Sequence, residues 1–286
     1  AERRRADEER GRGLTTPDTP PMQPDDDTYL LDNAWDLARA RFDGLEAASD
    51  AESVTNLQHL GVAPGWVCLE PGPGSGSIAA WLARAVAPGG RVVAVDLDPR
   101  YVPRDVPGLE VVQADLRTYE LPEARFDLVH SRAFLVHLPQ REEVIARLAR
   151  CLKPGGSALF EEPDWSTDGP EPEAPPELAA LYRRVMPRLM RLLGERGMAD
   201  RFGLALPAAA RRAGLVVRRT RAYTEVVQGG SAASRFERLT YLQFQPMALA
   251  AGVADPEEYR AFLDLFRDPA FSYVRPLICC VSATRP

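Results

Sequence analysis

The sequence predicts an α/β fold built on a doubly wound, largely parallel sheet, and three observations lead to this class. Short, nearly continuous apolar segments alternate with segments of helical periodicity between residues 66 and 161. A glycine loop follows the first apolar segment, and polar side chains stand where several of these segments end. Apolar strands separated by helices are typical of parallel sheets covered on both faces. Ligands bind such sheets outside the carboxyl ends of the strands.

Bulk composition excludes several classes of protein. The chain has 286 residues, enough for one sizeable domain with additions, and its net charge of −6 argues against a nucleic-acid binder. No apolar run approaches the ~18 residues of a membrane span, and no signal-peptide pattern opens the chain. The four cysteines lie in apolar runs without a C-x-x-C pair, which predicts reduced thiols and a cytoplasmic location.

The N-terminal region divides into a tail and a helical part. Residues 1–27 are charged and proline-rich, so we expect a disordered or loosely attached tail. A helix is predicted from Asn33. A second is predicted from Ser49, whose spacing to Glu52 matches a capping box. Because these helices precede the first strand, we expect them to cover the edge of the sheet or its ligand.

The remaining elements follow from periodicity and from turn residues. The alternating core is expected as strand 66–70, helix 75–86, strands 91–96, 109–113 and 126–130, helix 140–152, and strand 157–161. Helices 177–196 and 204–213 and strand 215–227 should follow, and then an inserted helical segment at 231–267 rich in aromatic residues.

The glycine loop points to the kind of ligand. It reads E-P-G-P-G-S-G, with Glu70 at the strand end and glycines at 72, 74 and 76. The spacing is not the G-x-G-x-x-G of a dinucleotide site. A carboxylate at this position would repel a pyrophosphate but suits a ligand with a cationic end. We therefore predict S-adenosylmethionine (SAM), whose methionine moiety carries an ammonium and a sulfonium.

Other strand ends carry polar residues in register with this loop. Asp96 ends the second strand and suits a bidentate contact with the two hydroxyls of a ribose. Asp115 follows the third strand and suits an adenine amino group. His130 and Ser131 end the fourth. Three acids in register with a glycine loop favour a nucleoside site at this edge.

The motifs together resemble a class I SAM-dependent methyltransferase, in particular the bacterial, often actinobacterial, small-molecule methyltransferases. The segments that carry the resemblance are EPGPGSG (70–76), VVAVDLDP (92–99), QADLR (113–117), FDLVHSRAFLVHLP (126–139) and LKPGG (152–156). The resemblance implies a Rossmann-like, doubly wound seven-stranded sheet of order 3-2-1-4-5-7-6, with an antiparallel last strand and a helical cap. It implies one methyltransferase domain over 28–286, made of a helical cap (28–60), a SAM-binding core (61–165) and a C-terminal half (166–286) with cap helices at 231–267.

The resemblance also implies roles for individual residues. Glu70 and Gly72 would face the methionine moiety, Asp96 the ribose, and Asp115 with Leu116 the adenine. Tyr29 would match an aromatic residue that closes over the cofactor. The expected cofactor-binding set is Tyr29, Glu70, Gly72, Gly74, Gly76, Asp96, Leu97, Asp115, Leu116, His130 and Ser131.

Candidates for chemistry and acceptor binding are fewer. Methyl transfer from a sulfonium needs mainly positioning and exclusion of water, and a hydroxyl acceptor also needs a base. Of the three histidines, His137 and His130 are the candidates, whereas His59 is expected to be packed or exposed. The expected acceptor residues are Glu162 or Asp164 after the fifth strand, and the aromatics Phe236, Tyr241 and Phe244. No metal-ligand spacing is present, so no metal is expected.

These observations predict a SAM-dependent methyltransferase that releases S-adenosyl-L-homocysteine. The expected partner is a small-molecule acceptor, with a place in secondary-metabolite biosynthesis, and neither nucleic acid nor membrane. A homodimer stays open. Two alternatives remain open: a protein or RNA methyltransferase, and a methyltransferase-like protein that binds SAM without transferring methyl, such as a cyclase or a binding module.

Overall fold

A seven-stranded sheet forms the centre of the computed structural model, which describes residues 29–286. The tail expected at 1–27 lies outside the described residues. The sheet order is β3-β2-β1-β4-β5-β10-β7, and β10 runs antiparallel to both of its neighbours. Numbered within this sheet alone, the order is 3-2-1-4-5-7-6, so the predicted fold is confirmed. The strands are β1 (Val67–Pro71), β2 (Arg91–Asp96), β3 (Leu109–Gln113), β4 (Phe126–Arg132), β5 (Leu152–Asp164), β7 (Val216–Tyr223) and β10 (Leu277–Thr284).

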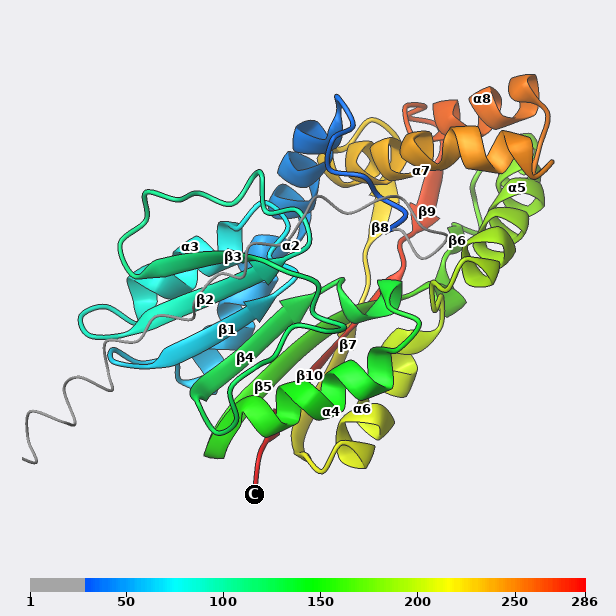
Figure 1. Ribbon diagram of the computed structural model, residues 1–286. Helices are drawn as coiled ribbons and strands as arrows, with labels where there is room; N and C mark the ends of the chain where they lie inside the picture. The colour runs from blue at the N-terminus through cyan, green and yellow to red at the C-terminus, as the bar shows by residue number, and fades with distance from the viewer. Residues whose placement is uncertain (1–28) are drawn as a thin grey trace, which may run out of the picture.

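Helices cover both faces of this sheet (Figure 1). On one face lie α4 (Arg141–Cys151) and α6 (Phe202–Arg212), and on the other α2 (Ala38–Leu60) and α3 (Ser77–Ala85). Successive side chains of β1 enter opposite layers: Leu69 packs in the core beneath α4 and α6, and Cys68 in the core beneath α2 and α3. The strands read as continuous apolar runs because both faces are buried.

A third apolar cluster builds a cap beyond the sheet (Figure 1). Its helices are α5 (Pro176–Glu195), α7 (Ala232–Ala250) and α8 (Pro256–Leu265), and aromatic side chains pack at tilted or edge-on angles around Tyr182 and Phe266. A small sheet of β6 (Gly169–Pro170), β9 (Ser272–Val274) and β8 (Val226–Gln228) joins the cap to the core. The expected single strand 215–227 is wrong, because it breaks after Tyr223 and β8 pairs with β9 instead of β10.

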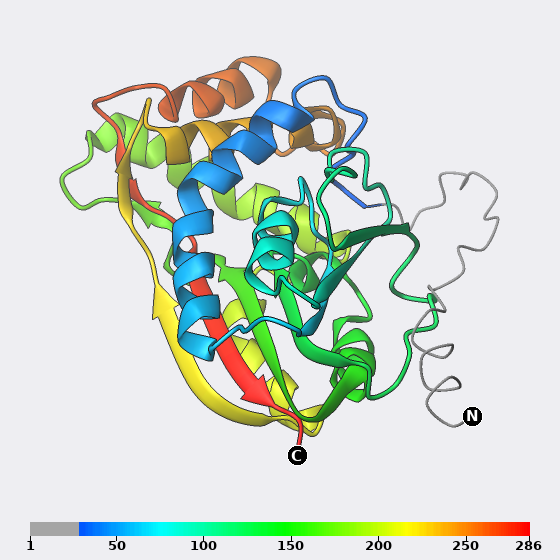
Figure 2. The ribbon, with the colours of Figure 1, turned by 90° about the vertical axis from the view of Figure 1, so that its left-hand side faces the viewer.

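The N-terminal helical part also differs from its prediction. Two helices were expected, with a capping box at Ser49, but α2 is continuous from Ala38 to Leu60. Ser49 lies in its interior and is buried. The preceding residues, Glu46, Ala47 and Ala48, are strong helix formers, so nothing breaks the helix there. Figure 2 shows α2 running from the cap down along the sheet, and it packs against α7.

The fifth strand is longer than the predicted segment 157–161. β5 spans Leu152–Asp164, so the acidic residues after Phe160 belong to the strand and lie among buried residues. Cys68, Cys151, Cys279 and Cys280 are free and buried. None of the helices described between residues 29 and 286 is long and apolar enough to cross a membrane.

Candidate active site

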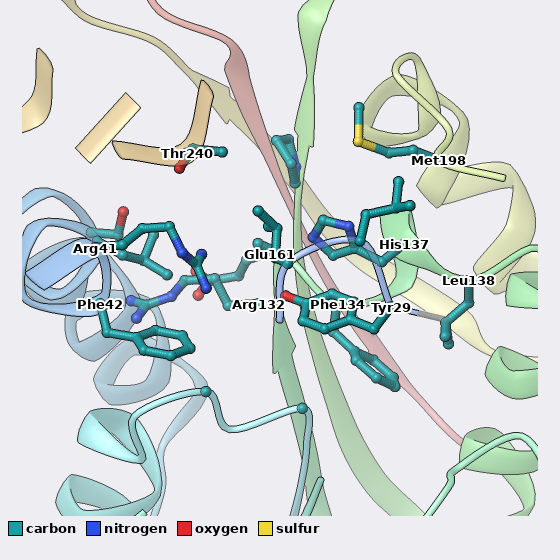
Figure 3. A pocket seen from close by; sticks show the side chains of 18 of the residues that line it. Tyr29, Arg41, Phe42, Arg132, Phe134, His137, Leu138, Glu161, Met198 and Thr240 are labelled. Carbon is teal, nitrogen blue, oxygen red and sulfur yellow. The ribbon is translucent and has the colours of Figure 1, made fainter. Parts of the chain in front are cut away.

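A cavity of about 240 Å³ lies where the strand ends meet the cap. One half is lined by the loops after β1, β2 and β3, including Gly74, Asp96 and Asp115. The other half is lined by cap and strand residues such as Trp165, Phe236 and several further apolar side chains. Figure 3 shows Arg41 and Phe42 approaching from α2, opposite Tyr29 and His137, with Glu161 between them. The cavity therefore offers a polar half and an aromatic half in one space.

The glycine loop adopts backbone conformations that favour glycine. Gly72, Gly74 and Gly76 have φ of 63°, 58° and 82°. A Cβ on Gly72 would lie 2.3 Å from the Phe134 ring, and one on Gly74 would lie 2.9 Å from the Phe42 ring. The missing side chains thus leave room for two aromatic rings that line the cavity, in addition to exposing backbone at the start of α3.

Acids at the next two strand ends line the same half. Asp96 ends β2, and its carboxylate accepts hydrogen bonds from the backbone N–H of Asp98, at 2.9 Å, and of Gly74. Burial raises the pKa of Asp96, and these N–H donors oppose the rise. Asp115 pairs with Arg117 at 2.9 Å. Leu97 and Leu116 line the cavity beside the two acids. The predicted ribose and adenine residues therefore lie in one cavity.

Three strand ends are joined beneath the cavity by a buried charged chain. His130 of β4 lies between Glu70 of β1 and Glu161 of β5. Its Nδ1 lies 2.8 Å from a Glu70 oxygen, and its Nε2 lies 3.1 Å from a Glu161 oxygen. Glu70 and Glu161 line the cavity, whereas His130 is fully buried behind them. The histidine thus fixes the orientation of both carboxylates.

Hydrogen bonds extend this series of buried side chains to α2. Ser53 and Asn56 each donate to Glu161, at 2.5 and 2.7 Å. Arg132, two residues after His130 on β4, lines the cavity and donates to Ser53 and to Asp50, at 3.0 and 2.8 Å. The continuity of α2 through Ser49 is what brings Asp50, Ser53 and Asn56 to the strand ends.

Protonation in this chain follows from the paired charges. Burial lowers the pKa of His130, but the charges and hydrogen bonds of Glu70 and Glu161 outweigh burial and raise it to about 9. For Glu161, burial raises the pKa, and its contacts with His130, Ser53 and Asn56 outweigh burial and hold it well below its usual range. At neutral pH these shifts favour an imidazolium at His130 paired with a carboxylate at Glu161.

The pKa of His137 is shifted in the opposite direction from that of His130. It lies in the 3-10 helix Leu135–His137, lines the cavity, and meets the Tyr29 ring edge-on at 5.2 Å between centroids. Burial, and then the charge of Arg41, lowers the pKa of His137 to about 4. Its Nδ1 is buried without a hydrogen-bond partner among the described residues. The ring is therefore neutral at pH 7, with one nitrogen available toward a ligand.

Several predicted site residues do not line the cavity. His130 and Ser131 are fully buried. Glu162 is also fully buried, and its carboxylate accepts the backbone N–H groups of Phe134, Leu135 and Val136 at 3.1, 2.9 and 3.0 Å. It holds the β4–α4 loop, so the structure gives it no place among acceptor contacts. Asp164 likewise accepts the backbone N–H groups at positions 166 and 204.

The predicted cap aromatics do line the cavity. Tyr241 and Phe244 are buried in the cap cluster, and Phe236 is half-buried with its Cβ against Gly44 of α2. Sequence reasoning missed other lining residues, notably Arg41, Arg132 and Met198. A signal for Arg41 was present, because it falls on the apolar stripe of Ala38, Phe42 and Leu45 at helical spacing.

Comparisons with known proteins identify the class. Residues 69–160 match the family model described as "Methyltransferase domain". The chain is 32% identical over 128 residues to an uncharacterized 37.1 kDa transposon protein of Streptomyces fradiae, covering 43% of this chain and 37% of that protein. It is 35% identical over 115 residues to a ubiquinone/menaquinone biosynthesis C-methyltransferase of Pseudomonas putida, covering 37% of this chain and 45% of that enzyme. The match thus spans less than half the length of these relatives.

One solved structure places the fold. A phosphoethanolamine N-methyltransferase of Haemonchus contortus, in complex with phosphomonomethylethanolamine and S-adenosylhomocysteine, superposes with a TM-score of 0.53 at 18% identity, covering 90% of this chain and 59% of that one. The chain carries a methyltransferase domain on a class I methyltransferase fold, and the predicted resemblance is confirmed. Among the described residues no group of histidine, cysteine and acidic side chains could hold a metal ion.

The residues of the cavity fit SAM. Asp96, which was predicted for the ribose, and Asp115 and Leu116, which were predicted for the adenine, line its polar half. Glu70 and Glu161, which are joined by His130, line the same cavity and suit the cationic methionine end of SAM. Arg41 and Tyr29 also line the cavity, and the Tyr29 hydroxyl interacts with both Arg41 and Asp96.

Proposed function

We propose that this protein transfers a methyl group from SAM to a small-molecule acceptor bound beneath the cap. The observation that carries the proposal is that one cavity joins the nucleoside-binding strand ends to an aromatic wall from α7 and the cap. The methyltransferase domain at 69–160 supports the cofactor, and a methyltransferase of quinone biosynthesis among the relatives agrees with a small acceptor. A role in secondary-metabolite biosynthesis is the finer form of this proposal.

In this mechanism the chain mainly binds, orients and excludes water. When bound, SAM supplies an electrophilic methyl group on a sulfonium that is already a good leaving group. The Glu70 and Glu161 side chains, which His130 orients, would stabilise a cationic ligand end. His137, neutral at pH 7, would accept a hydrogen bond at Nδ1 from an acceptor hydroxyl. The buried cap aromatics would close the acceptor off from solvent.

The proposal is tested by the product. Incubation with SAM and a library of small hydroxyl-, amine- and carbon-acceptor compounds should release S-adenosylhomocysteine with at least one of them. Tight SAM binding without release across the library would favour the alternative of a cyclase or binding module. Release only with protein or RNA would favour the other alternative, a protein or RNA methyltransferase.

We also propose a cytoplasmic location, with which the free, buried cysteines agree.

Asp96→Ala should weaken SAM binding about tenfold to a hundredfold, because it removes a charge-assisted contact with the ribose. The measurement is calorimetric titration of SAM, with the melting temperature recorded for both proteins. Asp98→Ala is the matched control: this acid is two residues away, pairs with Arg100 and does not line the cavity. Equal affinity for the Asp96 variant and wild type would remove the ribose from this site.

Phe236→Ala should raise the acceptor KM about tenfold, because an aromatic wall of the acceptor half is lost. SAM affinity should stay within about threefold of wild type, a difference of ~0.7 kcal/mol. Arg235→Ala, an exposed neighbour on α7, is the control. An unchanged KM in a folded Phe236 variant would place the acceptor elsewhere in the cavity.

A further inference from the structure

Arg41 is a buried cation that faces the cavity. It lies on α2, is 3% exposed, and lines the cavity together with Phe42. Burial lowers its pKa, although the neighbouring Tyr29 hydroxyl, which hydrogen-bonds with it, opposes the change. Burying a charge is costly unless it meets an opposite charge. Its position therefore requires an explanation.

The guanidinium has donors without partners on one edge. Its Nε and Nη2 atoms are buried and have no hydrogen-bond partner among the described residues. These two nitrogens point the same way from the planar group and form the fork that meets both oxygens of a carboxylate. Three other arginines on the cavity wall have acidic partners: Arg117 contacts Asp115, Arg132 contacts Asp50, and Arg275 contacts Glu237.

The surroundings of Arg41 place this fork at the glycine loop. Its guanidinium carbon lies 4.6 Å from the centre of the Phe42 ring. A Cβ on Gly74 would lie 2.9 Å from the edge of the same ring. The Phe42 ring therefore separates the Arg41 guanidinium from the glycine loop that follows β1. Figure 3 shows Arg41 on the same side of the cavity as Phe42. This is the methionine end of the proposed cofactor site.

We propose that Arg41 binds the carboxylate of the methionine moiety of SAM through Nε and Nη2. The inference rests on the proposed function. Recognition at this end then uses both signs of charge: the Glu70–His130–Glu161 chain for the cationic groups, and Arg41 for the anionic one. An anionic group on the acceptor would bind Arg41 through the same contacts. The experiment must therefore distinguish the carboxylate of SAM from an anion on the acceptor.

The experiment compares SAM with decarboxylated SAM, an analogue that lacks only the carboxylate. Wild-type protein should bind SAM about tenfold to a hundredfold more tightly than the analogue. Arg41→Gln should lose that factor for SAM and bind the analogue within about threefold of wild type. Arg39→Gln is the matched control, since Arg39 is two residues away on α2, half-exposed, and paired with Asp43 and Glu46.

The outcomes separate this inference from the proposed function. Binding of neither compound by wild-type protein would end the proposed function. Equal binding of both compounds by wild-type protein would overturn the role of the carboxylate, even if the Arg41 variant does not fold. An Arg41→Gln protein with wild-type SAM affinity and a raised acceptor KM would overturn it too and move Arg41 to the acceptor. Equal losses for SAM and the analogue would show a damaged cavity instead of a carboxylate site.

Discussion

His130→Phe should lower the free energy of unfolding by about 3–5 kcal/mol, the cost of removing one partner from a buried ion pair. An aromatic ring is kept, but Glu70 and Glu161 lose the polar group that lies between them at 2.8 and 3.1 Å. Both carboxylates would then be buried with less compensation. Urea unfolding at pH 6 measures the change, and His59→Phe, at an exposed position on α2, is the control.

The dependence of stability on pH gives a second test of the contacts between His130 and the two glutamates. The pKa of His130 is raised to about 9 in the folded protein, against ~6.5 for an unfolded histidine. A raised pKa contributes stability that is complete below the unfolded value and is lost as the pH rises through the folded value. Wild-type protein should therefore lose stability between about pH 6.5 and 9. The His130→Phe protein should lack this loss, and the same slope in both proteins would contradict a charged histidine.

Glu162→Ala should cost about 3 kcal/mol, because two buried backbone N–H groups and one partly buried one lose their acceptor, and each unsatisfied group costs ~1–3 kcal/mol. Those groups belong to the residues from Phe134 to Val136, and the Phe134 ring packs on Gly72 in the cavity wall. SAM affinity should therefore fall together with stability. Both are measured by urea unfolding and calorimetry.

Two further variants sharpen this test. Glu162→Gln keeps the length of the side chain and one carbonyl oxygen, so it should fall between wild type and the alanine variant. Glu143→Ala, at an exposed site on α4, should be neutral. A Glu162→Ala protein as stable as wild type would mean that water or other groups satisfy the loop.

Much of the fold could be predicted from local patterns. Apolar strands, a glycine loop and helix periodicity are properties of short windows, and they define a parallel sheet with its ligand edge. The strand-end residues Glu70, Asp96 and Asp115 could be placed because the carboxyl ends of parallel strands share one edge. All three line the cavity.

The rest depends on contacts between distant residues. His130 is 60 residues from Glu70 and 31 from Glu161, so its role as the link between them has no local pattern. Glu162 was predicted to meet an acceptor because its strand appeared to end earlier, whereas in β5 alternate side chains enter opposite sides. Glu161 therefore reaches the cavity, and Glu162 reaches the loop behind it. Likewise, the helical stripe predicts that Arg41 faces inward, but its place at the cavity depends on the packing of α2 against the distant helix α7.

The most direct test of the account is a crystal structure of the protein with S-adenosylhomocysteine. The account predicts the ribose hydroxyls within hydrogen-bonding distance of the Asp96 carboxylate, the adenine beside Asp115 and Leu116, and the amino-acid end at the glycine loop between Glu70 and Arg41. A nucleoside bound away from the carboxyl ends of β1, β2 and β3, or seated among the aromatics of α7, would contradict it.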